Sequence, residues 1–191
     1  MISDSTELKI IEAAIECVEA YGLKGATNRR IAERAGVNLA AINYYFRSKD
    51  NLIDKVMQTT LHNAFDWEDF NKLPGDSAKE LCINIFLDLM DGGCKYPGMT
   101  RAHFYDLLTE GNYDSLSVKK YSEFLAKLVE NIHQRGTGLS KDELRMALAQ
   151  IASACMLGII APQMHHAALG LDLLDEKHRR QFVSELVNKL L

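Results

Sequence analysis

Apolar residues recur at three- and four-residue intervals along almost the whole chain, and no stretch shows the two-residue alternation of a β-strand. This periodicity predicts an all-α fold. Capping Ser, Thr and Asn residues, and glycines that end helices, divide the pattern into about nine helices. They are expected over residues 6–21, 27–35, 38–45, 48–61, 78–90, 99–110, 115–135, 141–169 and 175–191. The apolar face of the first is predicted to carry Leu8, Ile11, Ile15 and Val18.

Two further helix signals come from glycine and proline. Gly92 and Gly93 are expected to end the helix that begins at residue 78, and Pro162 is expected to kink the helix over 141–169. Between residues 66 and 77, which include Pro74 and Gly75, the helical pattern breaks. We therefore expect one domain over residues 1–50, a connecting helix over 51–66 and a second domain over 67–191.

Charge is unevenly distributed along the sequence. The whole chain has a formal net charge of −4. The segment from Lys24 to Lys49, however, holds six basic residues and one acidic residue. A short basic segment in an acidic protein is typical of a local phosphate-binding face.

The residues of this basic segment specify two short helices that cross at a tight turn. Ala32 is small enough for close contact between the helices, and Gly36 adopts the positive φ of the turn without steric cost. Val37 and Ile42 are expected to fill the core beneath the second helix, which Asn38 caps. The pattern predicts a helix-turn-helix, whose second helix enters a DNA major groove.

Residues 8–52 resemble the DNA-binding domain of the TetR (tetracycline repressor) family of bacterial regulators. The resemblance rests on three blocks and on the spacing between them: Ile31-Ala32-x-x-Ala35-Gly36-Val37, Tyr45-Phe46, and Ser48-Lys49-Asp50-x-Leu52. It covers about a quarter of the chain. It implies a three-helix DNA-binding domain followed by a larger helical domain that binds a ligand and forms dimers. The implied protein is a ligand-responsive repressor that binds a palindromic operator.

The resemblance and the chemistry of the side chains together predict the DNA contacts. Thr27 and Lys49 match phosphate-contacting positions of the family, and Arg29 and Arg47 are expected to add phosphate contacts. The groove face is expected to consist of Asn38, Leu39, Ala40, Ala41, Asn43 and Tyr44. Many family members have a phosphate-contacting Tyr at the position of Asn43, so this contact differs here and Tyr44 is an alternative donor.

The second domain is predicted to hold an effector pocket and a dimer interface. Aromatic, methionine and polar side chains are candidates for the pocket wall; they are Trp67, Phe86, Met90, His103, Phe104, Tyr121, Phe124 and Met156. The last two helices are apolar on more than one face, as expected if they also pack against a second copy. The candidate interface residues are Leu148, Ile151, Cys155, Ile159, Phe182, Val183, Leu186 and Leu190.

Two other functions are compatible with a helical fold. One is a small-molecule-binding or scaffolding protein without operator recognition. The other is a helical-bundle enzyme that uses His103, Asp106 and Glu110, which share one helical face. The second has no recognisable nucleophile, so we expect no enzyme and no cofactor. His165 and His166 point about 100° apart on a helix, and we expect no metal site.

The remaining sequence features concern the cellular compartment. The four cysteines are far apart and form no C-x-x-C pair, so they are expected to be small apolar residues in a reducing environment. No apolar run approaches the roughly 18 residues that span a bilayer. The amino terminus has no basic segment followed by an apolar one. These features predict a cytoplasmic protein with no membrane partner.

Overall fold

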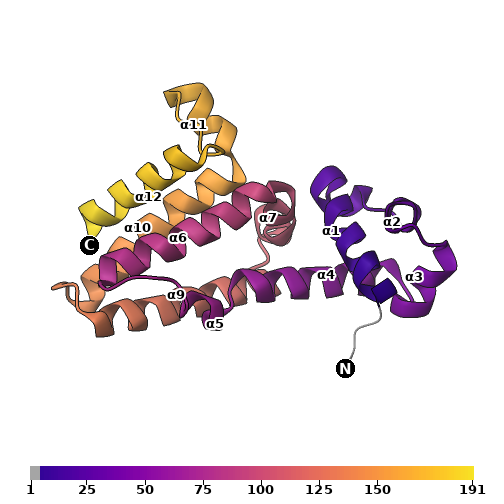
Figure 1. Ribbon diagram of the computed structural model, residues 1–191, viewed down its shortest axis with the longest axis horizontal. Coiled ribbons are helices and arrows are strands. Elements are labelled where there is room, and N and C mark those ends of the chain that lie inside the picture. The colour runs from indigo at the N-terminus through magenta and orange to yellow at the C-terminus, as the bar shows by residue number, and fades with distance from the viewer. Residues whose placement is uncertain (1–4) are drawn as a thin grey trace. The chain divides into compact units, whose positions relative to one another are not determined.

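The computed structural model describes residues 5–191, and every regular element in that range is a helix (Figure 1). The elements are α1 (Ser5–Gly25), α2 (Asn28–Ala35), α3 (Leu39–Phe46), α4 (Lys49–Ala64), α5 (Trp67–Phe70), α6 (Ala78–Lys95), α7 (Pro97–His103), α8 (Tyr105–Glu110), α9 (Leu116–Arg135), α10 (Lys141–Ile160), α11 (Pro162–Leu169) and α12 (Glu176–Leu190). The all-α prediction is confirmed. More helices form than the nine expected, because α5 is additional and because two expected helices are each divided in two.

The division between α10 and α11 has a local cause. The backbone of Ala161 leaves the helical region, with φ −137° and ψ 57°, and Pro162 opens α11. Proline has no N–H for the helical hydrogen bond, and its ring disfavours the helical conformation of the preceding residue. The predicted kink is therefore a complete break.

Gly92 and Gly93 do not end their helix, contrary to the prediction, because α6 continues to Lys95. A Cβ atom on Gly93 would lie 2.6 Å from Cγ2 of Ile159 on α10. Glycine at this position lets α10 approach the backbone of α6. Gly93 therefore serves helix packing and does not end α6.

The chain divides into two compact units. The first comprises the chain up to Asn63 together with Gly98–Gly111, and the second comprises Ala64–Pro97 and Asn112–Leu191. In the first unit the buried residues of α1 to α4 and α7 form one core. It contains Ile10, Ile11, Ala13, Ala14, Cys17, Val18, Ala26, Ile31, Ala32, Ile42, Phe46, Leu52, Val56, Met99 and Ala102.

Residues 98–111 belong to the first unit, although the sequence grouped them with 67–191. The backbone N–H of Met99 donates to Oε2 of Glu19 on α1 at 2.8 Å. A Cβ atom on Gly98 would lie 2.4 Å from the carbonyl oxygen of Glu19, so only glycine allows α7 to approach α1 this closely. No local sequence pattern signals this contact, because it joins residues about 80 positions apart.

The second unit is built around its four long helices α6, α9, α10 and α12 (Figure 1). By length and composition alone, α10 is apolar enough to cross a membrane, with a mean hydropathy of 1.4 over its most apolar window. It packs against α6, α9 and α12, as the central helix of a globular unit does. Only 44% of that window is buried, however, so much of this apolar helix faces outward.

Candidate nucleic-acid interface

The turn between α2 and α3 has the geometry that the sequence predicts. Gly36 adopts the left-handed conformation, with φ 67° and ψ 30°. At the start of α3, Oδ1 of Asn38 accepts a hydrogen bond from the backbone N–H of Ala41 at 2.9 Å. Ile42 and Phe46 lie on the inner side of α3 and are buried in the core of the first unit. These core contacts set the orientation of the helix.

The other side of α3 faces solvent. Tyr44 is 81% exposed and Leu39 is 49% exposed. Ala40 and Asn43 are exposed and Ala41 is half-buried. The side chains expected to form the groove face therefore lie on the accessible side of the helix.

The predicted phosphate contacts lie at the start of α2, at the end of α3 and at the start of α4. Thr27 caps α2, and its side chain accepts a hydrogen bond from the backbone N–H of Arg30. Nζ of Lys49 donates to the carbonyl oxygen of Leu23 at 2.9 Å, which fixes the ammonium group near the end of α1 and leaves its other protons for further acceptors. Arg47 is exposed and follows α3 with a positive φ of 65°.

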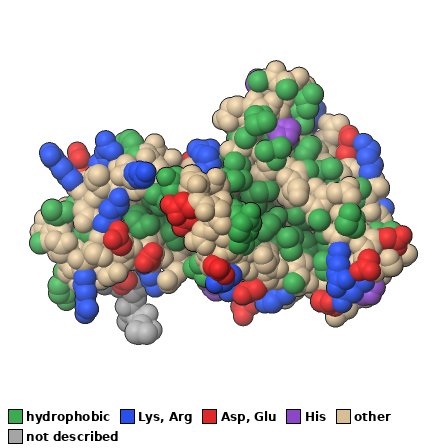
Figure 2. Space-filling model, turned by 180° about the vertical axis from the view of Figure 1, so that it is seen from behind, with side chains coloured by type: hydrophobic (Ala, Val, Ile, Leu, Met, Phe, Trp, Pro, Cys, Tyr) green, Lys and Arg blue, Asp and Glu red, His purple; other side chains and the backbone are tan. Residues whose placement is uncertain are grey.

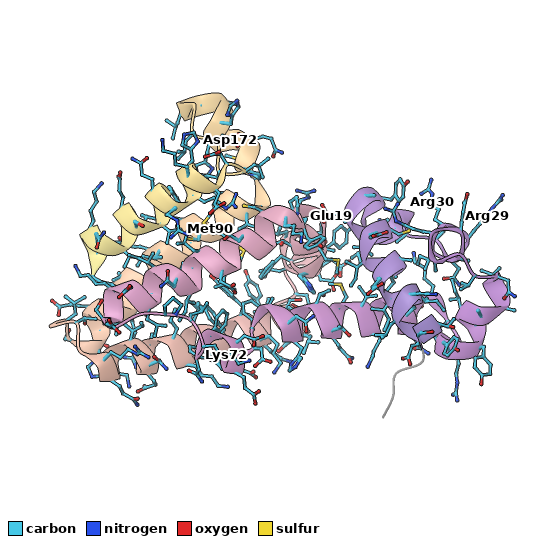
Figure 3. All side chains as sticks on the ribbon, in the orientation of Figure 1. Glu19, Arg29, Arg30, Lys72, Met90 and Asp172 are labelled. Atoms are coloured by element: carbon cyan, nitrogen blue, oxygen red, sulfur yellow. The ribbon has the colours of Figure 1, made fainter. Side chains whose placement is uncertain are left out.

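Three arginines on α2 differ in what they contact. Arg30 donates to the carbonyl oxygen of Gly25 at 2.8 Å, and its guanidinium lies 4.5 Å from the ring centroid of Tyr21. Arg34 forms an ion pair with Glu16 on α1. Arg29 is exposed, and Figure 3 shows its side chain pointing away from the neighbouring helices. Arg30 and Arg34 thus hold α2 against α1.

This difference predicts opposite effects for two neighbouring substitutions. Arg29→Ala should weaken DNA binding roughly tenfold and reduce the salt slope by about 1, because one phosphate contact is lost. The melting temperature of the Arg29→Ala variant should equal that of the wild type. Fluorescence anisotropy over a range of salt concentrations, together with thermal unfolding, measures both properties.

Arg30→Ala should instead lower the melting temperature by roughly 2–4 °C, because an exposed cation–π contact and a hydrogen bond are lost at about 1 kcal/mol. The salt slope of DNA binding should not change. A reduced slope in Arg30→Ala with unchanged stability would place Arg30 among the phosphate contacts.

The three residues considered for catalysis lie on two separate helices and differ in exposure. His103 lies on α7 and is half-buried, with Nε2 2.9 Å from Oγ1 of Thr60. Asp106 and Glu110 are exposed on α8. No group of three or more His, Cys, Asp or Glu residues that could bind a metal occurs within residues 5–191.

Burial lowers the pKa of His103 to about 4. In the unfolded chain His titrates near 6.5, so as pH falls below this value the unfolded state gains a proton that the folded state does not bind. The stabilisation by neutral His103 is complete above pH 6.5, is lost progressively as pH falls below this value, and stops falling at about pH 4, where the folded state also binds the proton. Between pH 7.5 and 5.5 the loss should be about 1 kcal/mol, and denaturant unfolding should show it in the wild type and not in His103→Gln.

The cysteines are all free thiols, and three of them are buried. Burial raises the pKa of Cys155 to about 12, so its thiol is protonated at neutral pH. It also raises the pKa of Cys94 and Cys17. These properties fit the predicted role of small apolar residues.

The predicted effector residues are divided between the units. His103 and Phe104 belong to the first unit, and the other six belong to the second. Phe86, Met90 and Phe124 are buried in the core of the second unit, and Trp67, Tyr121 and Met156 are half-buried. Trp67 and Tyr121 both stack on Phe124, with centroid distances of 5.8 and 6.4 Å. These side chains pack on one another, and their ligand-binding role stays a prediction.

The predicted dimer residues also fall into two groups. Five are buried inside their own protomer and offer no surface to a partner: Leu148, Ile151, Cys155, Ile159 and Val183. This corrects the sequence-based selection, which took the apolar side chains of two core helices without separating the inward face from the outward one. Phe182, Leu186 and Leu190 are partly exposed on α12. On α10 the outward apolar residues are Met146 and Leu157, which are 65% and 45% exposed.

Comparison with known proteins agrees with this geometry. Residues 10–56 match the family model described as bacterial regulatory proteins of the tetR family. The chain carries a TetR-family domain. This domain contains the helix-turn-helix and the start of α4. The predicted family resemblance is confirmed.

Named relatives of the TetR-family domain are transcriptional regulators. The regulator BetI 1 of Chromohalobacter salexigens is 40% identical over 58 residues, which are 30% of this chain and 29% of that protein. The probable regulator YttP of Bacillus subtilis is 42% identical over 104 residues, which are 51% of this chain and 48% of that protein. The chain thus spans about half, or less, of the length of these relatives.

Solved TetR-type structures share the fold over almost the full chain. A regulator from Aquifex aeolicus has a TM-score of 0.70 at 15% identity, covering 98% of this chain and 100% of that one. FadR from Bacillus subtilis, solved in complex with stearoyl-CoA, has a TM-score of 0.65 at 19% identity, covering 96% and 98%. At these identities the comparison shows the fold alone.

Proposed function

We propose that this protein is a ligand-responsive transcriptional repressor that binds a palindromic operator as a homodimer in the cytoplasm. The observation that carries the proposal is the exposed face of α3, which basic residues precede and follow in the sequence. A buried face orients α3, while Leu39, Ala40, Asn43 and Tyr44 remain open to base edges. Lys and Arg side chains project from the first unit in Figure 2.

We propose two kinds of contact for this interface. Thr27, Arg29, Arg47 and Lys49 hold the sugar-phosphate backbones and set the register. The groove is read by the N-cap of α3 and by its outward side chains: Asn38, Leu39, Ala40, Ala41, Asn43 and Tyr44. Small side chains at Ala40 and Ala41 let the helix approach the bases, and their methyl groups match the thymine methyl group.

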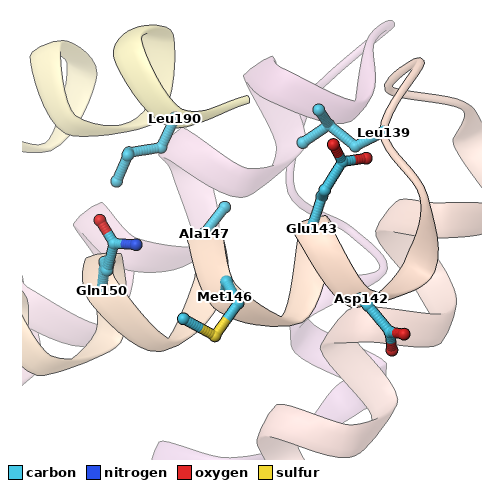
Figure 4. Close-up of a pocket in the computed structure, with 7 residues that line it drawn as sticks. All are labelled: Leu139, Asp142, Glu143, Met146, Ala147, Gln150 and Leu190. Carbon is cyan, nitrogen blue, oxygen red and sulfur yellow. The ribbon is translucent and has the colours of Figure 1, made fainter.

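The second copy is proposed to pack on the outward faces of α10 and α12. A groove of about 400 Å³ lies between the start of α10 and the end of α12, and its walls include Met146, Ala147 and Leu190 (Figure 4). Together with Leu157, Phe182 and Leu186, these residues give an apolar surface typical of permanent interfaces. Dimerisation supplies two DNA-binding domains, one for each half-site of a palindromic operator.

The effector is proposed to be a molecule with an apolar part that binds in the second unit. The similar FadR structure holds stearoyl-CoA, and the aromatic and methionine cluster around Phe124 offers an apolar environment. Repression is relieved if the effector favours an arrangement of the dimer with lower operator affinity. We propose no catalytic activity.

The proposal is tested with a duplex from the upstream region of the gene for this protein. The dimer should retard this duplex at low salt, and its affinity should fall steeply as salt rises, because binding releases phosphate counterions. A shuffled duplex of the same length is the control. Equal affinity for both duplexes would favour the small-molecule-binding or scaffolding alternative.

A further inference from the structure

A second groove, of about 440 Å³, lies between α5 and α9 in the second unit. Trp67 and Asn71 border it on the α5 side. The other side is one face of α9 and consists of Ala126, Lys127, Glu130, Asn131 and Gln134. None of these residues except Trp67 belongs to the sites described above.

Two polar atoms of this lining have no hydrogen-bond partner. Nε1 of Trp67 is a donor without an acceptor, and Oδ1 of Asn131 is an acceptor without a donor. Each exposes less than 1 Å² to solvent. Buried polar atoms in folded proteins nearly always have partners, because an unpaired one costs stability. Both residues line the same groove, so a ligand that displaces the side chains covering these atoms would meet one unpaired donor and one unpaired acceptor.

Neighbouring side chains restrict how Trp67 could satisfy its N–H by rotation. The indole ring stacks on Phe124 with an interplanar angle of 29° and meets Phe70 edge-on at a centroid distance of 5.5 Å. Both phenylalanines are core residues, with 1% and 2% exposure. The direction of the indole N–H is thus set by the core of the unit.

The groove offers neutral polar groups more than charge. Glu130 already forms an ion pair with Lys141, and Asn71 and Gln134 contribute carboxamides. We propose that this groove binds the amide group of a small ligand. The amide oxygen accepts from Nε1 of Trp67, the amide N–H donates to Oδ1 of Asn131, and the apolar part of the ligand covers the exposed part of the indole. Ligand binding in this groove does not depend on operator binding, so an experiment can refute one of these two proposals without the other.

Trp67 is the only tryptophan in the chain, so its indole N–H gives one resonance in a ¹H–¹⁵N correlation spectrum of the labelled protein. Acetanilide, which has an apolar ring and an amide, should move this resonance downfield with saturation. Acetophenone has the same ring and a carbonyl but no N–H donor, and it should bind about tenfold more weakly. An indole resonance that no probe moves would overturn the proposal, whether the N–H is already bonded to a trapped water or lies out of reach.

Two matched variants test the role of Asn131. Asn131→Leu removes the orphan acceptor and should weaken acetanilide binding about tenfold, to the level of acetophenone, without lowering the melting temperature. Asn188→Leu makes the same replacement at an exposed position of α12, outside the groove, and should leave acetanilide binding unchanged. Equal losses in both variants, or no loss in Asn131→Leu, would contradict the assignment.

Discussion

Ala40→Asp should weaken operator binding at least about a hundredfold, because a carboxylate on the groove face of α3 would meet the negative potential of the DNA at a cost of several kcal/mol. Ala40 is exposed, so the added side chain displaces no core residue. The first turn of α3 contains no acidic residue, and an aspartate there interacts favourably with the helix dipole. The variant should therefore fold as stably as the wild type while losing DNA binding.

The control for this prediction is Ala126→Asp. Ala126 is exposed on α9, and its replacement changes the net charge by the same amount in the second unit. Anisotropy titrations of a labelled duplex should give wild-type affinity for Ala126→Asp and little binding for Ala40→Asp. If Ala40→Asp binds as the wild type does, α3 is not the reading helix.

Arg179→Met should lower the stability of the second unit by about 3 kcal/mol, or roughly 6–12 °C in melting temperature. Arg179 is only 9% exposed, and its guanidinium makes an ion pair with Asp91 on α6 at 2.6 Å. It also donates to the carbonyl oxygens of Leu173 and Leu174 at 3.1 and 2.7 Å. Methionine retains much of the apolar contact but supplies no donor, so three acceptors lose their partner.

Arg180→Met is the matched control, because Arg180 is exposed on the same helix. Thermal unfolding followed by circular dichroism should show a large decrease for Arg179→Met and almost none for Arg180→Met. A loss below about 1 kcal/mol in Arg179→Met would mean that the guanidinium contributes no more than an exposed ion pair.

The helix-turn-helix is predictable from the sequence because the interactions that form it are local. The side chains of Thr27 and Asn38 each accept a hydrogen bond from the backbone N–H three residues further along the chain. Gly36 adopts its positive φ at no steric cost because glycine has no Cβ atom. These interactions need no knowledge of distant residues. The caps, the turn and the exposed face of α3 all follow from about twenty consecutive residues.

Features that depend on distant contacts are predicted less well. The first helix was expected to bury Leu8, Ile11, Ile15 and Val18. Ile11 and Val18 are buried and Ile15 is half-buried against the core, but Leu8 is 48% exposed, and Ile10 and Cys17 are buried as well. Both sets have helical spacing, and only the positions of α2 and α7 decide between them. Which face of α10 turns inward likewise depends on α6 and α12, so sequence alone selected buried residues for the dimer interface.

The arginines of the candidate site also differ through contacts with residues distant in the sequence. Arg29, Arg30 and Arg34 all lie in the basic segment, and the sequence indicates no partner within the protein for any of them. The partners that distinguish them are Tyr21 and Gly25 for Arg30 and Glu16 for Arg34, and all three come from α1. Spacing along α2 contains no information about these partners.

Selection of bound sequences from a random pool of duplexes tests the central claim most directly. The wild-type protein should enrich an inverted repeat, with half-site centres separated by about one helical turn of DNA or a multiple of it. Ala40→Asp should enrich nothing. Enrichment of no sequence by the wild-type protein at low ionic strength, or the same enrichment by Ala40→Asp, would contradict operator reading by α3.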